Sequence, residues 1–267
     1  RPNVRRMTAY SSARDEFTGS EGIFLDANEL PYGTLNRYPD PYQKALRGAL
    51  AKRLNVDMDQ IFTGNGSDEV IDLVMRLFCT PGQGKICTIS PSYGMYKVSA
   101  ELNDLEVLEV PLGTNFALPI PELIRCAAAP EVELMFLCSP NNPTGNAFRV
   151  EELRQILDAA QCVVVMDEAY AEFSDEISAI SLVDAYPNLV VTRTMSKAWG
   201  LAAARVGIAV SNPQIVQWLM KIKPPYNMSK LNQEAALAAL GDAEEYARRL
   251  AQVLEAKKEL AEALEAC

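Results

Sequence analysis

The sequence predicts an α/β protein built on a mainly parallel β-sheet with helices on both faces. Its 267 residues, 49% of them hydrophobic, suffice for one large domain with a substantial core. From about residue 60 onward, short β-rich runs alternate with helix-like segments. The runs are apolar on both faces, which is typical of strands that helices cover from either side.

Six of these runs are predicted strands, and the amphipathic stretches beside them are predicted helices. The strands span residues 85–89, 105–110, 134–138, 162–166, 189–193 and 206–210. The helices include residues 68–78, 93–101, 150–160 and 213–220. Because ligands of such sheets bind at the carboxyl ends of the strands, we expect a functional site in the loops that follow these runs.

Two segments fall outside the alternation. Residues 1–30 are predicted to form an extended N-terminal arm, and residues 31–241 the large domain. Residues 242–267 contain a long predicted helix, 242–266, with an apolar stripe that Lys257 interrupts. The stripe consists of Tyr246, Leu250, Val253, Leu260 and Leu264. Such a helix is too long for the surface of a compact domain, so we expect it to lead to a second domain beyond residue 267.

The charge balance and the lack of histidine narrow the possible functions. There are 25 basic against 35 acidic side chains, a net charge of −10, which argues against binding to nucleic acid or to anionic membranes. With no histidine, the Ser-His-Asp and Cys-His arrangements, histidine general bases and histidine-containing zinc sites are excluded, and no metal is expected. The chemistry must use other side chains or a bound cofactor.

The six cysteines form no C-x-x-C pair, and most lie in apolar runs, so we expect buried, reduced thiols. The apolar stretches are too short to span a bilayer. Residues 1–6 include three arginines. In a signal peptide an apolar segment would follow such residues, and none follows here. The expectation is a soluble, cytoplasmic protein.

Two glycine-rich turns resemble phosphate loops, but neither matches a dinucleotide fingerprint or a P-loop. The first, residues 64–69, contains Gly66, Ser67 and Asp68 directly before a predicted helix. Its backbone N–H groups would suit a phosphate at the helix N-terminus, and a plain N-cap is the alternative. The second, residues 82–85, lacks the required glycine spacing.

Polar residues follow three predicted strands. The turn at residues 139–145 would let Asn142 point at a ligand, or else cap the backbone of a tight turn. Asp167 and Tyr170 follow the strand 162–166, and a carboxylate buried there needs a cationic partner. Lys197 follows the strand 189–193 among small and apolar residues, which would free its amine as a nucleophile. Taken singly, a lysine after a strand is usually a solvated surface charge, and that alternative stays open until the other residues are considered.

Together these residues supply the parts of a pyridoxal phosphate site. Such a site needs an amine, a carboxylate at the pyridine nitrogen, donors to the ring oxygen, an aromatic face and a phosphate cup. The sequence offers Lys197, Asp167, Asn142 with Tyr170, Tyr93, and Ser67 and Asp68 with Thr194, Ser196 and Arg205. A cofactor that accepts electrons also makes histidine unnecessary.

The chain resembles fold-type I pyridoxal-phosphate aminotransferases, and more closely the histidinol-phosphate aminotransferase family. The broad pattern is carried by residues 142–145, 167–170, Ser196-Lys197 and Arg205. The closer likeness is carried by residues 25–29, 36–40, 64–69 and 91–96, and by the early segment 10–14. The resemblance implies a seven-stranded type of sheet, a small C-terminal domain largely outside this chain, and an arginine in that domain that binds substrate.

The resemblance also implies residue roles. Lys197 would bind pyridoxal 5′-phosphate as a Schiff base and move the proton, while Asp167 would keep the pyridine nitrogen protonated. Asn142 and Tyr170 would hydrogen-bond the ring oxygen, and Tyr93 would stack on the ring. The phosphate would be bound by Gly66, Ser67, Asp68, Thr194, Ser196 and Arg205. The catalytic residues would be Lys197, Asp167 and Tyr170.

Further residues, some of them in the arm, are implied to bind the substrate or to serve a shared site. Tyr38 would reach the cofactor phosphate of a neighbouring subunit, which implies a homodimer. Tyr10, Asn28 and Asn142 would bind the substrate, a phosphorylated amino compound. The implied reaction transfers an amino group between histidinol phosphate and 2-oxoglutarate, giving imidazole acetol phosphate and glutamate in histidine biosynthesis. The alternatives are an aromatic or other amino-acid aminotransferase, a threonine-phosphate decarboxylase, or a non-catalytic cofactor-binding or structural module.

Overall fold

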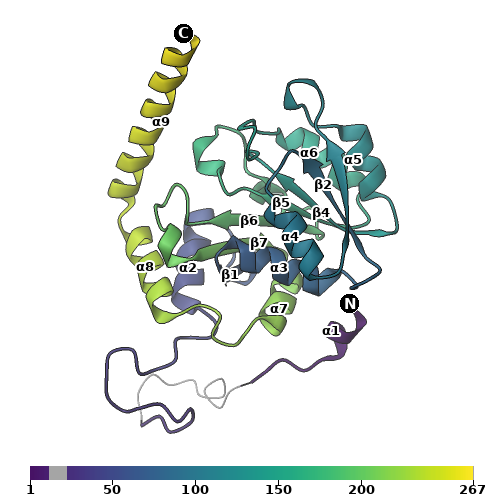
Figure 1. Cartoon of the computed structure of the whole chain (residues 1–267). Helices are drawn as coiled ribbons and strands as arrows, with labels where there is room; N and C mark the ends of the chain where they lie inside the picture. The colour runs from purple at the N-terminus through teal and green to yellow at the C-terminus, as the bar shows by residue number, and fades with distance from the viewer. Residues whose placement is uncertain (12–22, 267) are drawn as a thin grey trace.

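The computed structural model describes residues 1–11 and 23–266 and contains a seven-stranded sheet (Figure 1). The strands are β1 (Ile61–Asn65), β2 (Lys85–Ser90), β3 (Glu106–Pro111), β4 (Val132–Cys138), β5 (Val163–Asp167), β6 (Leu189–Thr194) and β7 (Val206–Ser211). Their spatial order is β1-β7-β6-β5-β4-β2-β3. In the series β3, β2, β4, β5, β6, each strand is parallel to the next. Strand β7 is antiparallel to both β6 and β1. The predicted α/β class and mainly parallel sheet are therefore confirmed.

All six predicted strands occur, each with ends within about two residues of the prediction, the usual accuracy of such boundaries. The sequence analysis missed β1, which pairs with β7 so that Phe62 lies opposite Ala209. The strand is short, and its second half contains glycine and asparagine, residues that are depleted in strands. Only the pairing with β7 identifies it.

The described residues form nine helices, of which α1 to α8 pack around the sheet. They are α1 (Pro2–Arg6), α2 (Lys44–Leu54), α3 (Ser67–Phe78), α4 (Met95–Leu102), α5 (Ile120–Ala127), α6 (Val150–Ala159), α7 (Pro213–Ile222), α8 (Lys230–Gly241) and α9 (Ala243–Glu265). Short 3-10 turns lie at 58–60, 114–116, 171–173, 179–182 and 202–204. The four predicted helices correspond to α3, α4, α6 and α7.

The sheet has a hydrophobic core on each face, as the apolar strands predict. One core packs against α2, α5, α6 and α8, and the other against α1, α3, α4 and α7. Strand β6 shows the alternation directly, since Leu189 and Val191 belong to the first core while Val190 belongs to the second. A strand with both faces covered must be apolar at every position, which is why these runs were recognisable.

The N-terminal arm is not extended throughout. Residues 2–6 form α1, and Val4 is buried in the core beside α3. The amino group of Arg1 donates a hydrogen bond to the carbonyl oxygen of Leu77 at 3.1 Å. Residues 12–14 of the segment that resembles one branch of the family lie outside the described part of the chain, and so does Cys267.

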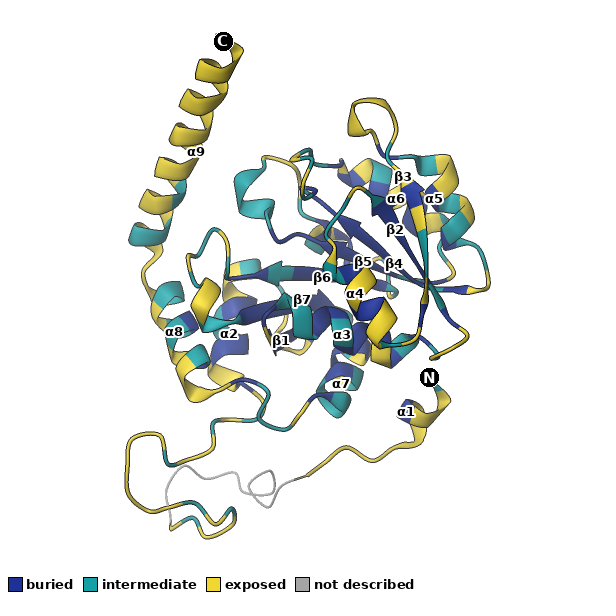
Figure 2. Cartoon of the chain, in the orientation of Figure 1, coloured by how far each residue is buried: buried dark blue, intermediate teal, exposed yellow. Residues whose placement is uncertain are grey.

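Helix α9 confirms the predicted long C-terminal helix, and it projects from the rest of the molecule (Figure 1). Figure 2 shows it as exposed over nearly its whole length. Of the predicted apolar stripe, Val253, Leu260 and Leu264 face solvent, with Leu264 66% exposed, whereas Tyr246 and Leu250 are partly buried. Within the described residues, no helix is both long and apolar enough to cross a membrane.

The described cysteines agree with the prediction of reduced, mostly buried thiols. Cys79, Cys87, Cys138 and Cys162 are free and buried, and Cys126 is free and partly buried. Burial raises the pKa of Cys79 and Cys138 to about 12 and that of Cys162 to about 11. These thiols are packing groups rather than nucleophiles.

Candidate active site

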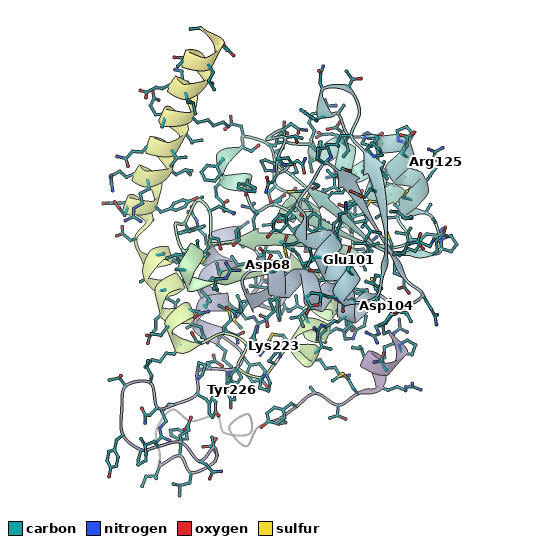
Figure 3. All side chains as sticks on the ribbon, viewed as in Figure 1. Asp68, Glu101, Asp104, Arg125, Lys223 and Tyr226 are labelled. Atoms are coloured by element: carbon teal, nitrogen blue, oxygen red, sulfur yellow. The ribbon has the colours of Figure 1, made fainter. Side chains whose placement is uncertain are left out.

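A pocket opens at the carboxyl ends of β4, β5 and β6, where the N-terminus of α3 also arrives. Its lining residues are Ser67, Asp68, Tyr93, Cys138, Asn142, Asp167, Ala169, Tyr170, Thr194, Ser196, Lys197 and Arg205. Figure 3 labels Asp68 near the middle of the molecule, over the sheet. The structure therefore brings together all of the predicted cofactor contacts except Gly66, which precedes α3 at its N-cap, and Tyr38.

Asp167 is the most constrained polar group of the pocket, with only 2% of its surface exposed. Its carboxylate accepts hydrogen bonds from the Tyr96 hydroxyl at 2.7 Å, the Thr192 hydroxyl at 3.0 Å and the Ala169 amide at 3.2 Å. Burial raises the pKa of Asp167, and these three hydrogen bonds oppose the rise.

The sequence predicts a cationic partner for Asp167. Among the described residues, no lysine or arginine forms an ion pair with this carboxylate. A buried carboxylate that faces a pocket without such a partner is suited to a protonated ring nitrogen. Asp167 thus fits the pyridine nitrogen of pyridoxal phosphate.

Lys197 lies in the loop that follows β6. The loop is closed by hydrogen bonds from the Gly200 amide to the Lys197 carbonyl and from the Leu201 amide to the Met195 carbonyl, each at 2.9 Å. Lys197 lines the pocket but is exposed, so the expectation of enclosed, apolar surroundings is wrong. Its Nζ lies 5.2 Å from the centroid of the Tyr170 ring.

The turn before α3 forms a cradle of backbone atoms. Gly66 has φ of 82°, and no side chain caps the helix, so the reading as a plain side-chain N-cap is not supported. A Cβ on Gly66 would lie 2.3 Å from Arg205 Nη2, and one on Gly207 would lie 2.2 Å from the Gly66 carbonyl carbon. Only glycine permits this close approach, and the turn brings the N-terminus of α3, a suitable binding site for an anion, to the pocket.

Arg205 completes the cradle. Its guanidinium donates to Asp68 Oδ2 at 3.2 Å and to Ser196 Oγ at 3.4 Å. The arginine thus joins the N-terminus of α3 to the loop that carries Lys197. Arginine, serine and free backbone amides together form a suitable phosphate cup.

Two aromatic residues shape the wall of the pocket. Tyr93 donates to Asp68 Oδ1 at 3.1 Å, and burial with the charge of Asp68 raises the pKa of Tyr93 to about 12. Its ring packs edge-to-face on Tyr96, at 5.5 Å between centroids, and Tyr96 stacks on Phe136 at 4.8 Å. These contacts hold the Tyr93 ring in a defined orientation at the pocket.

The loop after β4 is held by Asn141 rather than Asn142. The Asn141 side chain donates to the Pro91 carbonyl at 3.0 Å and to the Thr144 hydroxyl at 2.7 Å, and its amide bonds the Asn146 carbonyl. The alternative in which Asn142 caps the turn is therefore not supported. Asn142 lines the pocket, where its side chain is available to a ligand.

The predicted arm residues lie elsewhere in this single chain. Tyr38 stacks on Tyr226 at 4.4 Å between centroids, and Figure 3 places Tyr226 low in the molecule, away from Asp68. Asn28 and Tyr38 line a cavity beside residues 229–231, and Tyr10 lines another with Tyr226. None of the three lines the strand-end pocket.

Sequence reasoning missed three residues around Asp167. Tyr96 lies in the quoted segment 91–96 but received no role, although a fully buried tyrosine hydroxyl needs a partner. Thr192 is the register neighbour of Asp167 on β6, which only the strand pairing reveals. Arg193, the next residue, pairs with Glu168 at 2.8 Å and Glu172 at 3.2 Å behind the pocket.

An open parallel sheet with an amine, a buried carboxylate and a phosphate cup at its strand ends defines a cofactor-dependent enzyme of the pyridoxal phosphate type. The chain belongs to the aminotransferase class I and II family, whose model matches residues 23–267.

Curated relatives and solved structures agree with the family. The chain is 50% identical over 245 residues to the histidinol-phosphate aminotransferase of Cytophaga hutchinsonii, covering 90% of this chain and 70% of that protein. It is 46% identical to that of Flavobacterium johnsoniae, covering 99% of this chain and 76% of that protein. The crystal structure of the Sinorhizobium meliloti enzyme in complex with pyridoxal-5′-phosphate superposes with a TM-score of 0.79 at 27% identity. That match covers 84% of this chain and 62% of the other.

Proposed function

We propose that this protein is a pyridoxal-phosphate-dependent histidinol-phosphate aminotransferase. It would transfer the amino group of L-histidinol phosphate to 2-oxoglutarate, giving imidazole acetol phosphate and glutamate in histidine biosynthesis. The observation that carries the proposal is the buried Asp167, which faces the same pocket as Lys197 without a basic partner among the described residues. The relatives that are about half identical support the choice of substrate.

Each pocket residue has a role in this proposal. When bound, pyridoxal phosphate supplies an electron-accepting ring that stabilises negative charge on a substrate carbon. Lys197 Nζ anchors the cofactor covalently and then carries the proton to and from the substrate carbon. Asp167 holds a proton on the ring nitrogen, Asn142 and Tyr170 donate to the ring oxygen, and Tyr93 covers one face of the ring. Gly66, Ser67, Asp68, Thr194, Ser196 and Arg205 bind the phosphate.

The proposal includes a homodimer with shared sites. Tyr38 of one subunit would bind the cofactor phosphate of the other, and Tyr10 and Asn28 would close over the substrate. The position of these residues supports the idea, because none of them lines the pocket of its own chain. A second subunit is the simplest way to bring an arm residue to a strand-end site.

The proposal also divides the chain into the arm (residues 1–30), the cofactor domain (31–241) and a helix (242–267) toward a small domain. Helix α9 supports this, because Val253, Leu260 and Leu264 of its apolar stripe are exposed and suited to pack against another domain. A cytoplasmic location is part of the proposal and is supported by the free thiols of the described cysteines.

The proposal is tested with the purified protein and its cofactor. Pyridoxal phosphate should give a visible absorption band, and borohydride should abolish the band and fix the cofactor on Lys197, identified by peptide mass spectrometry. Mixing with histidinol phosphate should convert the bound cofactor to its amino form rapidly. Phenylalanine and threonine phosphate should react far more slowly.

Two results would count against the proposal in different ways. A protein that binds no pyridoxal phosphate would exclude any enzyme of this class. Rapid conversion by phenylalanine, or release of carbon dioxide from threonine phosphate, would instead assign one of the alternative reactions.

A further inference from the structure

Helix α9 contacts the rest of the protein through its first turns only. Glu245, Tyr246 and Leu250 are partly buried, whereas every described residue from 251 to 266 is exposed. No residue of α9 is fully buried. The orientation of this long helix therefore depends on a few side chains near its N-terminus.

Tyr246 makes one of these contacts, with a partner that is close in sequence to the reactive lysine. Its ring stacks on Trp199 with 3.9 Å between centroids and 22° between planes. The guanidinium of Arg53, from α2, lies 5.6 Å from the Trp199 centroid and 5.3 Å from that of Tyr246. Cation and stacked rings attract each other, so the three side chains form one unit, the Tyr246 stack.

The Tyr246 stack is joined to the loop that carries Lys197. Trp199 is two positions after Lys197, inside the turn closed by the Gly200 amide and the Lys197 carbonyl at 2.9 Å. Gly200 has φ of 67°, which favours glycine and makes a sharp turn. A displacement of the Trp199 ring must therefore rotate the short backbone segment from which the lysine side chain extends.

Tyr246 also faces the groups that lie behind Asp167. It shares a small cavity with Glu172 and Arg193. Arg193 pairs with Glu172 at 3.2 Å and with Glu168, the residue after Asp167, at 2.8 Å. The second carboxylate oxygen of Glu172 is buried and has no hydrogen-bond partner. Its orientation thus depends on what packs around it, including the Tyr246 ring.

We infer that Tyr246 is a positioning residue that couples the orientation of α9 to the placement of Lys197. The inference deepens the proposed function, because it rests on Lys197 being the group that holds the cofactor. Tyr246 touches no reacting atom. It acts through Trp199 on one side and through the Glu172–Arg193 pair on the other. A tilt of α9 consequently changes the position of Lys197 relative to the buried Asp167.

The first test needs no cofactor. In the cofactor-free protein, Tyr246→Ala should speed amide hydrogen exchange in residues 195–201 by about tenfold, since the turn loses its outer support. Tyr246→Phe keeps the ring and should behave like the wild type. Val253→Ala, on an exposed part of the same helix, is the matched control. Unchanged exchange in Tyr246→Ala would overturn the inference, whatever the cofactor does.

The second test uses the holoenzyme. Tyr246→Ala should shift the pH at which the visible band of the bound cofactor changes, and should slow the single-turnover reaction by about tenfold. Cofactor affinity should change by less than about threefold, and Tyr246→Phe should restore both values. A lower melting temperature with a normal spectrum and turnover would mean that the stack only stabilises the fold, which contradicts the inference. A wild-type protein without a visible band would count against the proposed function, while the exchange result would still decide the role of Tyr246.

Discussion

The strand-end pocket differs from the arm region in how it is held. The arm region comprises residues 23–39, the described end of the N-terminal arm and the segment that follows it. The pocket is built by contacts between segments far apart in the chain, such as Tyr96 with Asp167 and Arg205 with Asp68. The arm holds itself by local contacts, such as the 2.7 Å ion pair of Arg37 with Glu29. Ile23 is 90% exposed, and Figure 2 shows most of the described arm as exposed.

This difference shows which part of the site a single chain can complete. The pocket residues extend from the ends of strands and from a helix that pack against two cores, so their positions are determined by the fold of one chain. The arm exposes apolar side chains, including Leu25, Leu30 and Tyr32, that gain nothing from this fold. A surface of that kind is suited to burial against a second molecule, which agrees with the proposed shared site.

The largest expected effect comes from removing the reactive group of the pocket. Lys197→Ala should lower the rate of amino transfer by about a thousandfold or more, because no other pocket residue carries an amine. Borohydride should no longer fix cofactor to the protein. Circular dichroism should match the wild type, since Lys197 is exposed, and appreciable covalent attachment in the variant would contradict the assignment.

The arm is tested next, with Tyr38→Ala. A lost hydrogen bond to a charged phosphate is worth about 1.5–3 kcal/mol, so cofactor affinity should fall by roughly tenfold to a hundredfold. Tyr32→Ala, another exposed arm tyrosine, is the matched control and should have little effect.

Mixing the two defects distinguishes a shared site from one made within a single subunit. Mixed dimers of Lys197→Ala and Tyr38→Ala subunits would each hold one intact site if the arm crosses over. Co-expression should then restore about one quarter of the wild-type activity, because half of the dimers are mixed. No recovery would mean that Tyr38 serves its own chain.

Asp167→Asn should show how much the buried charge of Asp167 lowers the stability of the folded protein. Burial raises the folded-state pKa of Asp167, so the folded protein binds more protons than the unfolded chain, whose aspartate pKa is about 3.9. The stability of the cofactor-free protein should therefore fall as pH rises from that value through the raised pKa. The asparagine variant carries no buried charge, so its stability should not fall in this way. At pH 7–8 its free energy of unfolding should be about 1–2 kcal/mol higher than that of the wild type.

The same variant should bind cofactor more weakly, since asparagine cannot hold a charged ring nitrogen. Urea titrations of the cofactor-free protein at several pH values measure the stability. Asp175→Asn, at an exposed position, is the control. Lower stability of Asp167→Asn at neutral pH would show that the three hydrogen bonds more than offset the cost of burying the charge.

The smallest effect is expected from Tyr96→Phe. The variant keeps the stacking on Phe136 but loses one of three donors to Asp167, worth about 1 kcal/mol. Cofactor affinity should fall by roughly fivefold, with a matching shift in the pH dependence of binding. An effect as large as that of Asp167→Asn would indicate that Tyr96 controls the ionisation of the carboxylate.

The success and the failures of the sequence analysis have physical causes. A strand buried on both faces must be apolar at successive positions, so β4, β5 and β6 were recognisable, and so were the polar residues at their ends. Strand β1 was not, because its short, glycine-containing segment is stabilised by pairing with β7. The surroundings of Lys197 were misjudged because sequence neighbours are not spatial neighbours in a loop.

The sequence by itself determined the α/β class, the strand ends where chemistry gathers, and the residue types of a pyridoxal phosphate site. These depend on local pattern and on which side chains can perform the chemistry. Only the tertiary structure decided that Tyr96 and Thr192 hold Asp167, that Asn141 rather than Asn142 ties the loop, and that Tyr246 packs on Trp199. Those contacts join segments distant along the chain, and strand register and helix packing bring them together.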